Sequence, residues 1–426
     1  MKGFRAYIAA LLMAVAALNL PGCSSAKTGG AAAYAADLMH DVSSSQINSR
    51  QADAAFNGSM AEFSIELLKK SIAAEKNALI SPLSVMLALA MTANGAGGET
   101  LVQMEKLLGG DIPIDTLNEY LYTYAQRLTN AGQPKLSIAN SIWFRDDGES
   151  LQVKPDFLQK NADYYGAAAF SSAFNAQTVK DINTWVNTNT DGMIRQILDG
   201  INDELLFLVN AVAFDAEWQN IYYKHNVIEG EFINTTGAVE RVDFMHSRES
   251  VYLDDGLATG FIKPYAGGVC SFAALLPNEG VSLDEYIVSL TGAGFLETLR
   301  NAQRAVVVAS MPKFEYEYEI EMAAALKTLG ITDAFDEFNA DFSNMASTKM
   351  GNGNIYIGRV LHKTFISVFE LGTKAGAATV VAASPGAAPN PEEPKTVRLD
   401  RPFVYAIIDN ATNLPIFIGT VLTVNK

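Results

Sequence analysis

Apolar positions recur along the chain with two different periods, and each period predicts a different kind of element. Between residues 56 and 67 they lie three or four positions apart, the spacing of one face of a helix. Between residues 311 and 320 apolar and charged residues alternate, which predicts a strand with one buried face. The stretch 205–214 is apolar throughout except for Asn210, the pattern of a central strand covered on both sides. Two further elements are predicted, a strand over 136–144 and a helix followed by irregular chain within 179–198.

The stretch 370–402 changes character half way along. From Thr373 to Val381 every second residue is small or β-branched and uncharged, so one face of an extended strand here would fit into a packed sheet. From Ser384 to Pro394 there are four prolines in eleven residues, which cannot continue a central strand and predict an exposed loop. On composition alone, this part of the chain is a flexible linker.

The flanks of this stretch resemble those of the reactive loop in the serpin family. Residues 360–379 read Val-Leu-His-Lys-Thr-Phe-Ile-Ser-Val-Phe-Glu-Leu-Gly-Thr-Lys-Ala-Gly-Ala-Ala-Thr and are similar to the family's strand and hinge. Residues 400–419 are similar to its C-terminal signature, and the resemblance extends over 56–426. It implies an α+β, serpin-like fold with a large central β-sheet, further sheets, surrounding helices and an exposed reactive loop at about 371–400.

Composition indicates one large domain. No Pro/Gly/Ser-rich or charged linker divides the chain before residue 384, so we expect residues 56–426 to fold as a single serpin domain. With 49% hydrophobic and 18% charged residues, a sizeable core is available. The net charge of −16 argues against a nucleic-acid partner, because binding to a phosphate backbone requires clustered Lys and Arg. We expect a monomer without a cofactor or metal.

The first 22 residues have the pattern of a secretory signal. Lys2 and Arg5 precede an apolar run over 6–20, which is too short to span a membrane. Leu20-Pro21-Gly22-Cys23 then resembles a bacterial lipobox, in which the cysteine thiol receives the lipid. The alternative is an ordinary signal peptide with a chance cysteine. We therefore expect residues 1–22 to be a lipoprotein signal peptide and Cys23 to be lipidated.

Lipidation would also assign a location. A palmitate-type anchor on Cys23 would hold the mature protein at the membrane of the bacterial cell envelope. Ser24 is not the aspartate that marks inner-membrane retention, so the outer membrane is expected. Residues 23–55 are rich in Ala, Ser and Gly and are expected to form a flexible tether.

Four polar residues that are far apart in the sequence are expected to meet. Ser81 precedes Pro82 at a helix start, where a serine cap and a first-position proline are favoured, so helix capping is the simplest interpretation of this serine. His362 alone is interpreted as a hydrogen-bonded core histidine rather than a catalytic one. In serpins, the matching residues form a polar cluster, called the shutter, where the main sheet parts to admit a strand. The resemblance therefore implies a shutter of Ser81, Ser84, Asn210 and His362.

A second region, called the breach in serpins, is where loop insertion begins. Trp218 matches the family tryptophan there, and Lys313 matches the lysine that pairs with the hinge glutamate, here Glu370. Lys374 and Leu371 depart from the common hinge pattern. The other hinge positions are small, as in inhibitory members of the family, and the expected hinge residues are Glu370, Gly372, Thr373, Ala375, Ala377 and Thr379.

The resemblance implies suicide inhibition of a serine protease, or alternatively of a cysteine protease. The protease would attack the loop, and the cleaved loop would enter the main sheet while the protease stays covalently bound. An enzyme is not expected, since the four histidines stand apart and no His-Glu-x-x-His, Cys-x-x-Cys or Gly-x-Ser-x-Gly occurs. The competing hypothesis is a non-inhibitory serpin-fold protein that binds a partner without loop insertion.

The bond that the protease would cut follows from a count along the loop. In serpins it usually follows the sixteenth residue after the hinge glutamate, which gives Gly386-Ala387 here, with Ala383-Ser384 as the alternative because the loop is longer than in compact members. The window 381–388 contains no Lys, Arg or aromatic residue. Because a deep or charged pocket would be poorly filled, we expect elastase-like or subtilisin-like targets.

Overall fold

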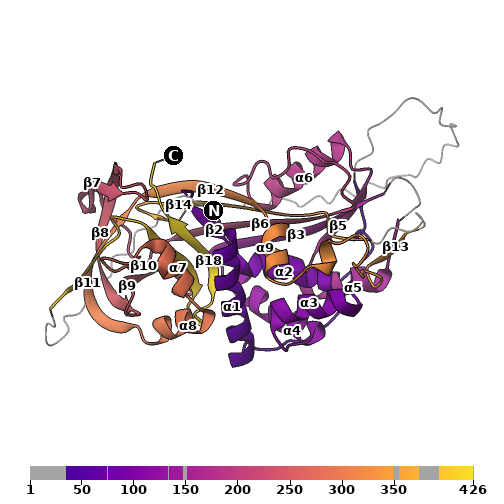
Figure 1. Ribbon diagram of the computed structural model, residues 1–426, viewed down its shortest axis with the longest axis horizontal. Helices are drawn as coiled ribbons and strands as arrows, with labels where there is room; N and C mark the ends of the chain where they lie inside the picture. Colours follow the sequence, from indigo (N-terminus) through magenta and orange to yellow (C-terminus); the bar gives the residue numbers. More distant parts are fainter. Residues whose placement is uncertain are drawn as a thin grey trace, which may run out of the picture. The chain divides into compact units, whose positions relative to one another are not determined.

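The computed structural model of the chain describes residues 35–73, 75–132, 134–146, 151–348, 355–373 and 393–425. These residues form two large mixed β-sheets with helices around them, and a small third sheet of β4 (Leu151–Val153) and β13 (Ala346–Thr348) (Figure 1). The α+β fold class is therefore confirmed.

The first large sheet, called here the central sheet, has seven strands. In spatial order these are β1 (Ala36–Asp37), β5 (Ala168–Ser172), β3 (Lys135–Arg145), β6 (Leu206–Glu217), β15 (Gly372–Thr373), β14 (Arg359–Val368) and β12 (Phe314–Glu321).

β6 is apolar on both faces because each face packs against other elements. Phe207 and Val209 pack in one hydrophobic cluster with α6 (Ala176–Asn189), whereas Leu208 and Val212 pack in the other with α2 (Pro82–Ala93). Figure 1 shows α6 on one side of the central sheet and α2 on the other. The prediction of a central strand covered on both faces is confirmed.

The second large sheet has nine strands, with β7 paired to β8 beside the main path. The path runs through β16 (Lys395–Arg398), β11 (Gln303–Pro312), β8 (Val239–Asp254), β9 (Ala258–Pro264), β10 (Cys270–Pro277), β17 (Phe403–Asp409), β18 (Pro415–Val421) and β2 (Ala78–Ile80), and β7 spans Val227–Ile233.

The remaining elements are helices, and α1 contains the helical pattern predicted over 56–67. Besides α2 and α6 they are α1 (Ala54–Ser71), α3 (Gly98–Gly109), α4 (Ile114–Thr129), α5 (Pro155–Tyr165), α7 (Leu283–Ser289), α8 (Gly292–Arg300), α9 (Ala323–Thr328) and two 3₁₀ turns, η1 (Lys224–Asn226) and η2 (Asp333–Phe335). Among the described helices, none combines the length and apolar character needed to cross a membrane.

The alternating stretch 311–320 is divided between the two large sheets. β11 ends at Pro312, and β12 begins at Phe314 in the central sheet. The proline has no N–H to extend a ladder, and the backbone N–H of Lys313 donates to the carbonyl of Asp243 at 2.9 Å. The prediction of a single strand here is therefore wrong for residues 311–313, which precede β12.

The segment before α1 lies against the domain over the part that the structure describes. β1 pairs antiparallel with β5, the backbone N–H of Ser45 donates to Asp163 at 2.7 Å, and that of Arg50 donates to Thr123 Oγ1 at 2.9 Å. A flexible tether was expected over residues 23–55. Residues 35–55 differ from that expectation, because their backbone donors and Leu38 contact the domain surface and α1 already begins at Ala54.

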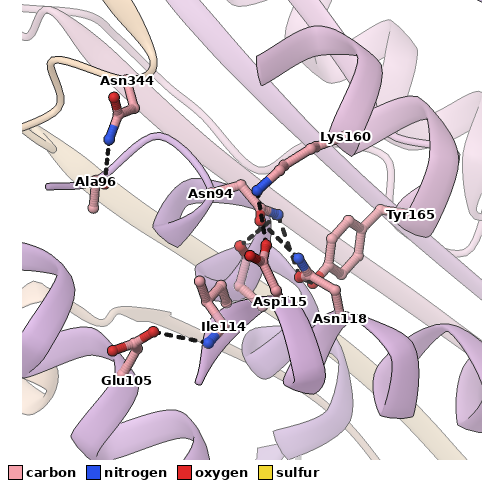
Figure 2. Close-up of polar contacts among 10 residues, drawn as sticks. Asn94, Ala96, Glu105, Ile114, Asp115, Asn118, Lys160, Tyr165 and Asn344 are labelled. Carbon is pink, nitrogen blue, oxygen red and sulfur yellow. Dashed lines mark hydrogen bonds and ion pairs between the residues drawn. The ribbon is translucent and has the colours of Figure 1, made fainter. Parts of the chain in front are cut away.

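A buried amide cluster fixes the C-terminal end of α2 (Figure 2). Asn118 Nδ2 of α4 donates to Asn94 Oδ1 at 2.7 Å, and Asn94 Nδ2 donates back at 3.3 Å. The hydroxyl of Tyr165, from α5, donates to Asn118 Oδ1. Since buried polar groups are costly to leave unpaired, this cluster holds α2 against α4 and α5.

Candidate functional site

The N-terminal end of α2 reaches the boundary between β6 and β14. Ser81 caps the helix, because its Oγ accepts from the N–H of Ser84 at 3.4 Å and donates to the carbonyl of Ile416 at 2.9 Å. The Ser81 side chain is fully buried. The cap therefore also links α2 to β18.

His362 of β14 is held as a neutral imidazole. Its Nε2 accepts from the backbone N–H of Ser81 at 3.2 Å, so the ring proton lies on Nδ1, which donates to Asn210 Oδ1 at 2.6 Å. Burial lowers the pKa of His362 to about 3. The imidazole therefore contributes fixed hydrogen bonds, and it is enclosed rather than exposed to a substrate.

Asn210 of β6 completes the shutter from the other strand. Its Nδ2 faces three acceptors, the carbonyl of Ser84 at 2.7 Å, Ser84 Oγ, and Asn140 Oδ1 at 2.5 Å. The structure thus brings together Ser81, Ser84, Asn210 and His362. Asn140 of β3 is a member that sequence reasoning missed. It lies directly opposite Asn210 in the β3–β6 register, a pairing that no local pattern reports.

β6 and β14 pair directly with each other at the shutter, but farther along they are separated by β15. Residues 359–363 pair in parallel with residues 207–211, so His362 lies opposite Asn210. Beyond this point β15 enters between the two strands. Thr373 pairs antiparallel with Val368 on one side and with Ala216 on the other.

Thr373 is buried where β15 enters the sheet. Its side chain is 2% exposed, and its Oγ1 is 2.6 Å from the hydroxyl of Tyr265. The Tyr265 ring stacks on Trp218, with centroids 4.5 Å apart. Gly372 is equally confined, because a Cβ there would lie 2.0 Å from the carbonyl oxygen of Ala216. Only a residue without a side chain fits at that position.

Three hydrogen bonds from residues 218–222 hold the turn before Gly372. The N–H of Trp218 donates to the carbonyl of Leu371 at 2.8 Å, and its Nε1 donates to the carbonyl of Phe369 at 2.9 Å. The N–H of Tyr222 donates to the carbonyl of Glu370 at 2.9 Å. Trp218 therefore contacts the turn before Gly372, and its assignment to the breach stays a prediction from the resemblance.

Lys313 lies beside the same turn. Its Nζ is 2.5 Å from Glu370 and 3.1 Å from Asp243. Burial alone would lower the pKa of Lys313, but the hydrogen bonds to Glu370 and then Asp243 outweigh it and raise the pKa. The structure brings Lys313 and Glu370 together as expected. Asp243 is an additional partner that the sequence did not indicate.

A buried ion pair that the sequence analysis did not predict contacts residues 218–222. Lys263 Nζ of β9 lies 3.0 Å from Glu249 of β8 and donates to the carbonyl of Asn220 at 3.0 Å. The ammonium also lies over the Tyr222 ring, 4.3 Å from its centroid. Burial lowers the pKa of Lys263, and Glu249 opposes that shift. A single charged residue, Lys263, in the strand Ala258–Pro264 was the only sequence signal.

Several expected residues lie outside the described residues: Cys23, Ala375, Ala377, Thr379, Ala383, Ser384, Gly386 and Ala387. Their expected roles stay predictions.

The comparisons with known proteins agree on one family. The family model described as "Serpin (serine protease inhibitor)" matches residues 58–424. The crystal structure of tengpin, a thermophilic serpin, in its native state is 52% identical, with a TM-score of 0.86 over 92% of this chain and 100% of that chain. Human Serpin B4 is 30% identical over 372 residues, 81% of this chain and 93% of that protein. Mouse leukocyte elastase inhibitor A is 29% identical over 81% of this chain and 92% of that protein.

Proposed function

The chain belongs to the serpin family of serine protease inhibitors, and on that premise we propose that it traps a serine protease as a suicide substrate. The protease attacks the reactive loop and forms an acyl-enzyme. The freed loop segment then enters the central sheet as a new strand and carries the covalently bound protease with it. Insertion of the reactive loop into the main sheet is the general mechanism of inhibitory serpins, and the proposal extends it to this chain.

The position of the hinge carries this proposal. Gly372 and Thr373 already form a short strand between β14 and β6, antiparallel to both. Continuing this strand in the same direction leads toward the parallel pairing of residues 359–363 with 207–211. An inserted strand of about fifteen residues, at roughly 3.3 Å per residue, would be about 50 Å long and would move the attached protease by a similar distance.

The residues of the loop support a class of target. Residues 381–388 are Val, Ala, Ser, Pro and Gly only, which fits proteases with shallow pockets, elastase-like or subtilisin-like. The similarity to leukocyte elastase inhibitor A of mouse agrees with an elastase-like target. We expect cleavage at Gly386-Ala387, or at Ala383-Ser384.

We also propose that the protein is lipid-anchored through Cys23, at the outer membrane of a bacterial cell. The lipobox-like Leu20-Pro21-Gly22-Cys23 supports this part of the proposal. Replacing Cys23 with Ala should abolish metabolic labelling with palmitate, and unchanged labelling would contradict it.

The inhibitory mechanism is tested by incubating residues 24–426 with subtilisin and with elastase. We expect a complex that survives SDS, and mass spectrometry should find a released C-terminal fragment that begins between residues 383 and 388.

Thr373→Arg, which places a charge in the sheet at a cost of several kcal/mol, should convert the inhibitor into a substrate. A matched change at an exposed position, Thr235→Arg, should leave trapping unchanged. Trapping by Thr373→Arg at the wild-type ratio would rule out insertion through β15.

A further inference from the structure

A cavity of about 490 Å³ lies at one edge of β3 and is also lined by residues of α4, α5 and α6. Figure 1 shows α4 and α5 on one side of the central sheet and α6 on the other. The volume is in the range of sites that bind small ligands. Residues 136–140 of β3 all contribute to the lining. Because the side chains of a strand point alternately to its two faces, five consecutive lining residues place the cavity along the edge of the strand.

The edge of β3 that faces the cavity has backbone groups without a strand partner. The backbone N–H of Arg145 donates to the residue before β6, and that of Asp146 donates to the last residue of β5. Backbone groups of successive residues thus point to opposite neighbours, so those of Leu136 and Ile138 point to the β5 side. The ladder with β5 begins only at Ser141, and among the residues that the structure describes no strand covers the β5 side of 136–140. Such an open edge is a template for pairing with another chain.

The walls of the cavity are aromatic and uncharged. Tyr122 and Tyr164 meet edge to face, with ring centroids 6.4 Å apart, and Tyr165 and Trp185 add two further rings. None of the described residues that line the cavity is charged, although 18% of the residues in the chain are. A charged ligand would lose its hydration here without gaining a partner, so the cavity favours a neutral ligand.

Asn140 connects this cavity to the shutter. Its Oδ1 accepts from Asn210 Nδ2 at 2.5 Å, and the same residue lines the cavity. The other four members of the shutter are fully buried, whereas Asn140 is only partly buried. Within the described part of the chain, Asn140 Nδ2 has no hydrogen-bond acceptor. A carbonyl oxygen of a ligand in the cavity would supply one.

We infer that the cavity binds a short, neutral peptide in an extended conformation, which pairs with residues 136–140 as an added strand. An extended peptide carries N–H and C=O groups at the spacing of a strand edge, and its side chains would contact the aromatic walls. A lipid chain or a flat hydrocarbon would fill the cavity but would leave the backbone groups of Leu136 and Ile138 unpaired. The site goes beyond the proposed function, because it lies on the β5 side of β3 and not at the boundary between β6 and β14.

The test measures binding of acetyl-Thr-Phe-Thr-amide, a neutral peptide, to the protein by isothermal titration calorimetry. The control peptide has the same side chains but a methyl group on the backbone nitrogen of each residue, which removes the N–H donors. Two variants of the protein are compared. Ala125→Phe places a ring in the cavity, and Ala324→Phe makes the same change at an exposed position of α9.

We expect wild type to bind one acetyl-Thr-Phe-Thr-amide per chain and to bind the methylated peptide at least about 10-fold more weakly, because each lost hydrogen bond reduces the affinity several-fold. Ala125→Phe should weaken binding by a similar factor, and Ala324→Phe should bind like wild type. If Ala125→Phe does not fold, the comparison of the two peptides on wild type still decides. Equal affinity for both peptides, or no binding to wild type, would overturn the inference and leave the proposed function intact.

An alternative position for the same peptide is between β6 and β14, where β15 begins a strand. Thr373→Arg distinguishes the two positions, because it places a charge at that entry and lies outside the cavity. The cavity site predicts that Thr373→Arg binds the peptide like wild type. Binding that Thr373→Arg abolishes and Ala125→Phe preserves would assign the peptide to the position next to β15 and would contradict the inference.

Discussion

The shutter and the breach lie on the same boundary between β6 and β14, yet they hold it in different ways. At the shutter, neutral groups close the boundary: His362 bonds directly to Asn210 across the two strands. At the breach, β15 already separates the strands, and an ion pair of Lys313 with Glu370 lies at the rim. Under the proposed mechanism, insertion would start at the breach, and the shutter would form the barrier that the inserting strand must cross.

The largest expected effect is a pH dependence that comes from the shutter. The pKa of His362 is about 3 in the folded protein and about 6.5 when unfolded, so only the unfolded state gains this proton between those values. Stability should therefore fall as pH decreases from about 6.5 to 3, by about 1.4 kcal/mol per pH unit, or about 5 kcal/mol in all. Stability from this group is fully present above a pH of about 6.5.

Urea unfolding of wild type and His362→Gln across that range measures the effect. The variant should show a shallower pH slope, and His40→Gln controls for the loss of an exposed imidazole. Equal slopes for wild type and His362→Gln would mean that the histidine is not held neutral.

The next effect concerns the buried ion pair of Lys263 with Glu249, which contacts residues 218–222. Lys263→Met leaves Glu249 buried without its partner, which should cost about 3–5 kcal/mol, whereas Lys263→Met/Glu249→Leu should be close to neutral. Equilibrium unfolding of both variants checks this. If the double variant is as unstable as the single one, the desolvated carboxylate is not the cause.

A smaller effect is expected for the first inserted side chain. Thr373→Val keeps the shape but removes the contact between Oγ1 and the Tyr265 hydroxyl, which leaves a buried polar group unpaired. We expect a loss of about 1–3 kcal/mol in stability. Thr373→Ser retains the hydroxyl and serves as the control. Equal stability of the Val and Ser variants would show that the contact contributes nothing.

The smallest effect is expected for the rim of the breach. Lys313 and Glu370 are both partly exposed, so solvent screening reduces their attraction, and Lys313→Met should cost only about 0–1 kcal/mol. The rate of loop insertion should respond more than stability does, because the pair lies where the strands separate. A stability loss well above this range, with unchanged insertion, would reverse the comparison between rim and shutter.

Much of the fold follows from local patterns, and the resemblance supplied most of the site. The double-sided apolar run predicted β6, and Ser81-Pro82 predicted the start of α2. Trp218 and Lys313 were assigned from family motifs, and the structure places both beside the turn before Gly372.

The residues that were missed depend on pairing between distant strands. Asn140 joins the shutter because of the β3–β6 register, and Glu249 meets Lys263 because β8 and β9 are neighbours. No spacing within the sequence encodes either contact. Likewise, an Ala- and Ser-rich composition predicts a tether before α1, but it does not reveal that β5 offers an edge with which β1 can pair.

The central claim is that the loop enters the sheet as a continuation of β15. The most direct test is thermal unfolding of the intact protein and of the protein cleaved once in the loop. Cleavage should raise the melting temperature markedly, because a new central strand adds ladder hydrogen bonds and buried area between β6 and β14. A cleaved protein that melts at or below the temperature of the intact one would contradict the claim.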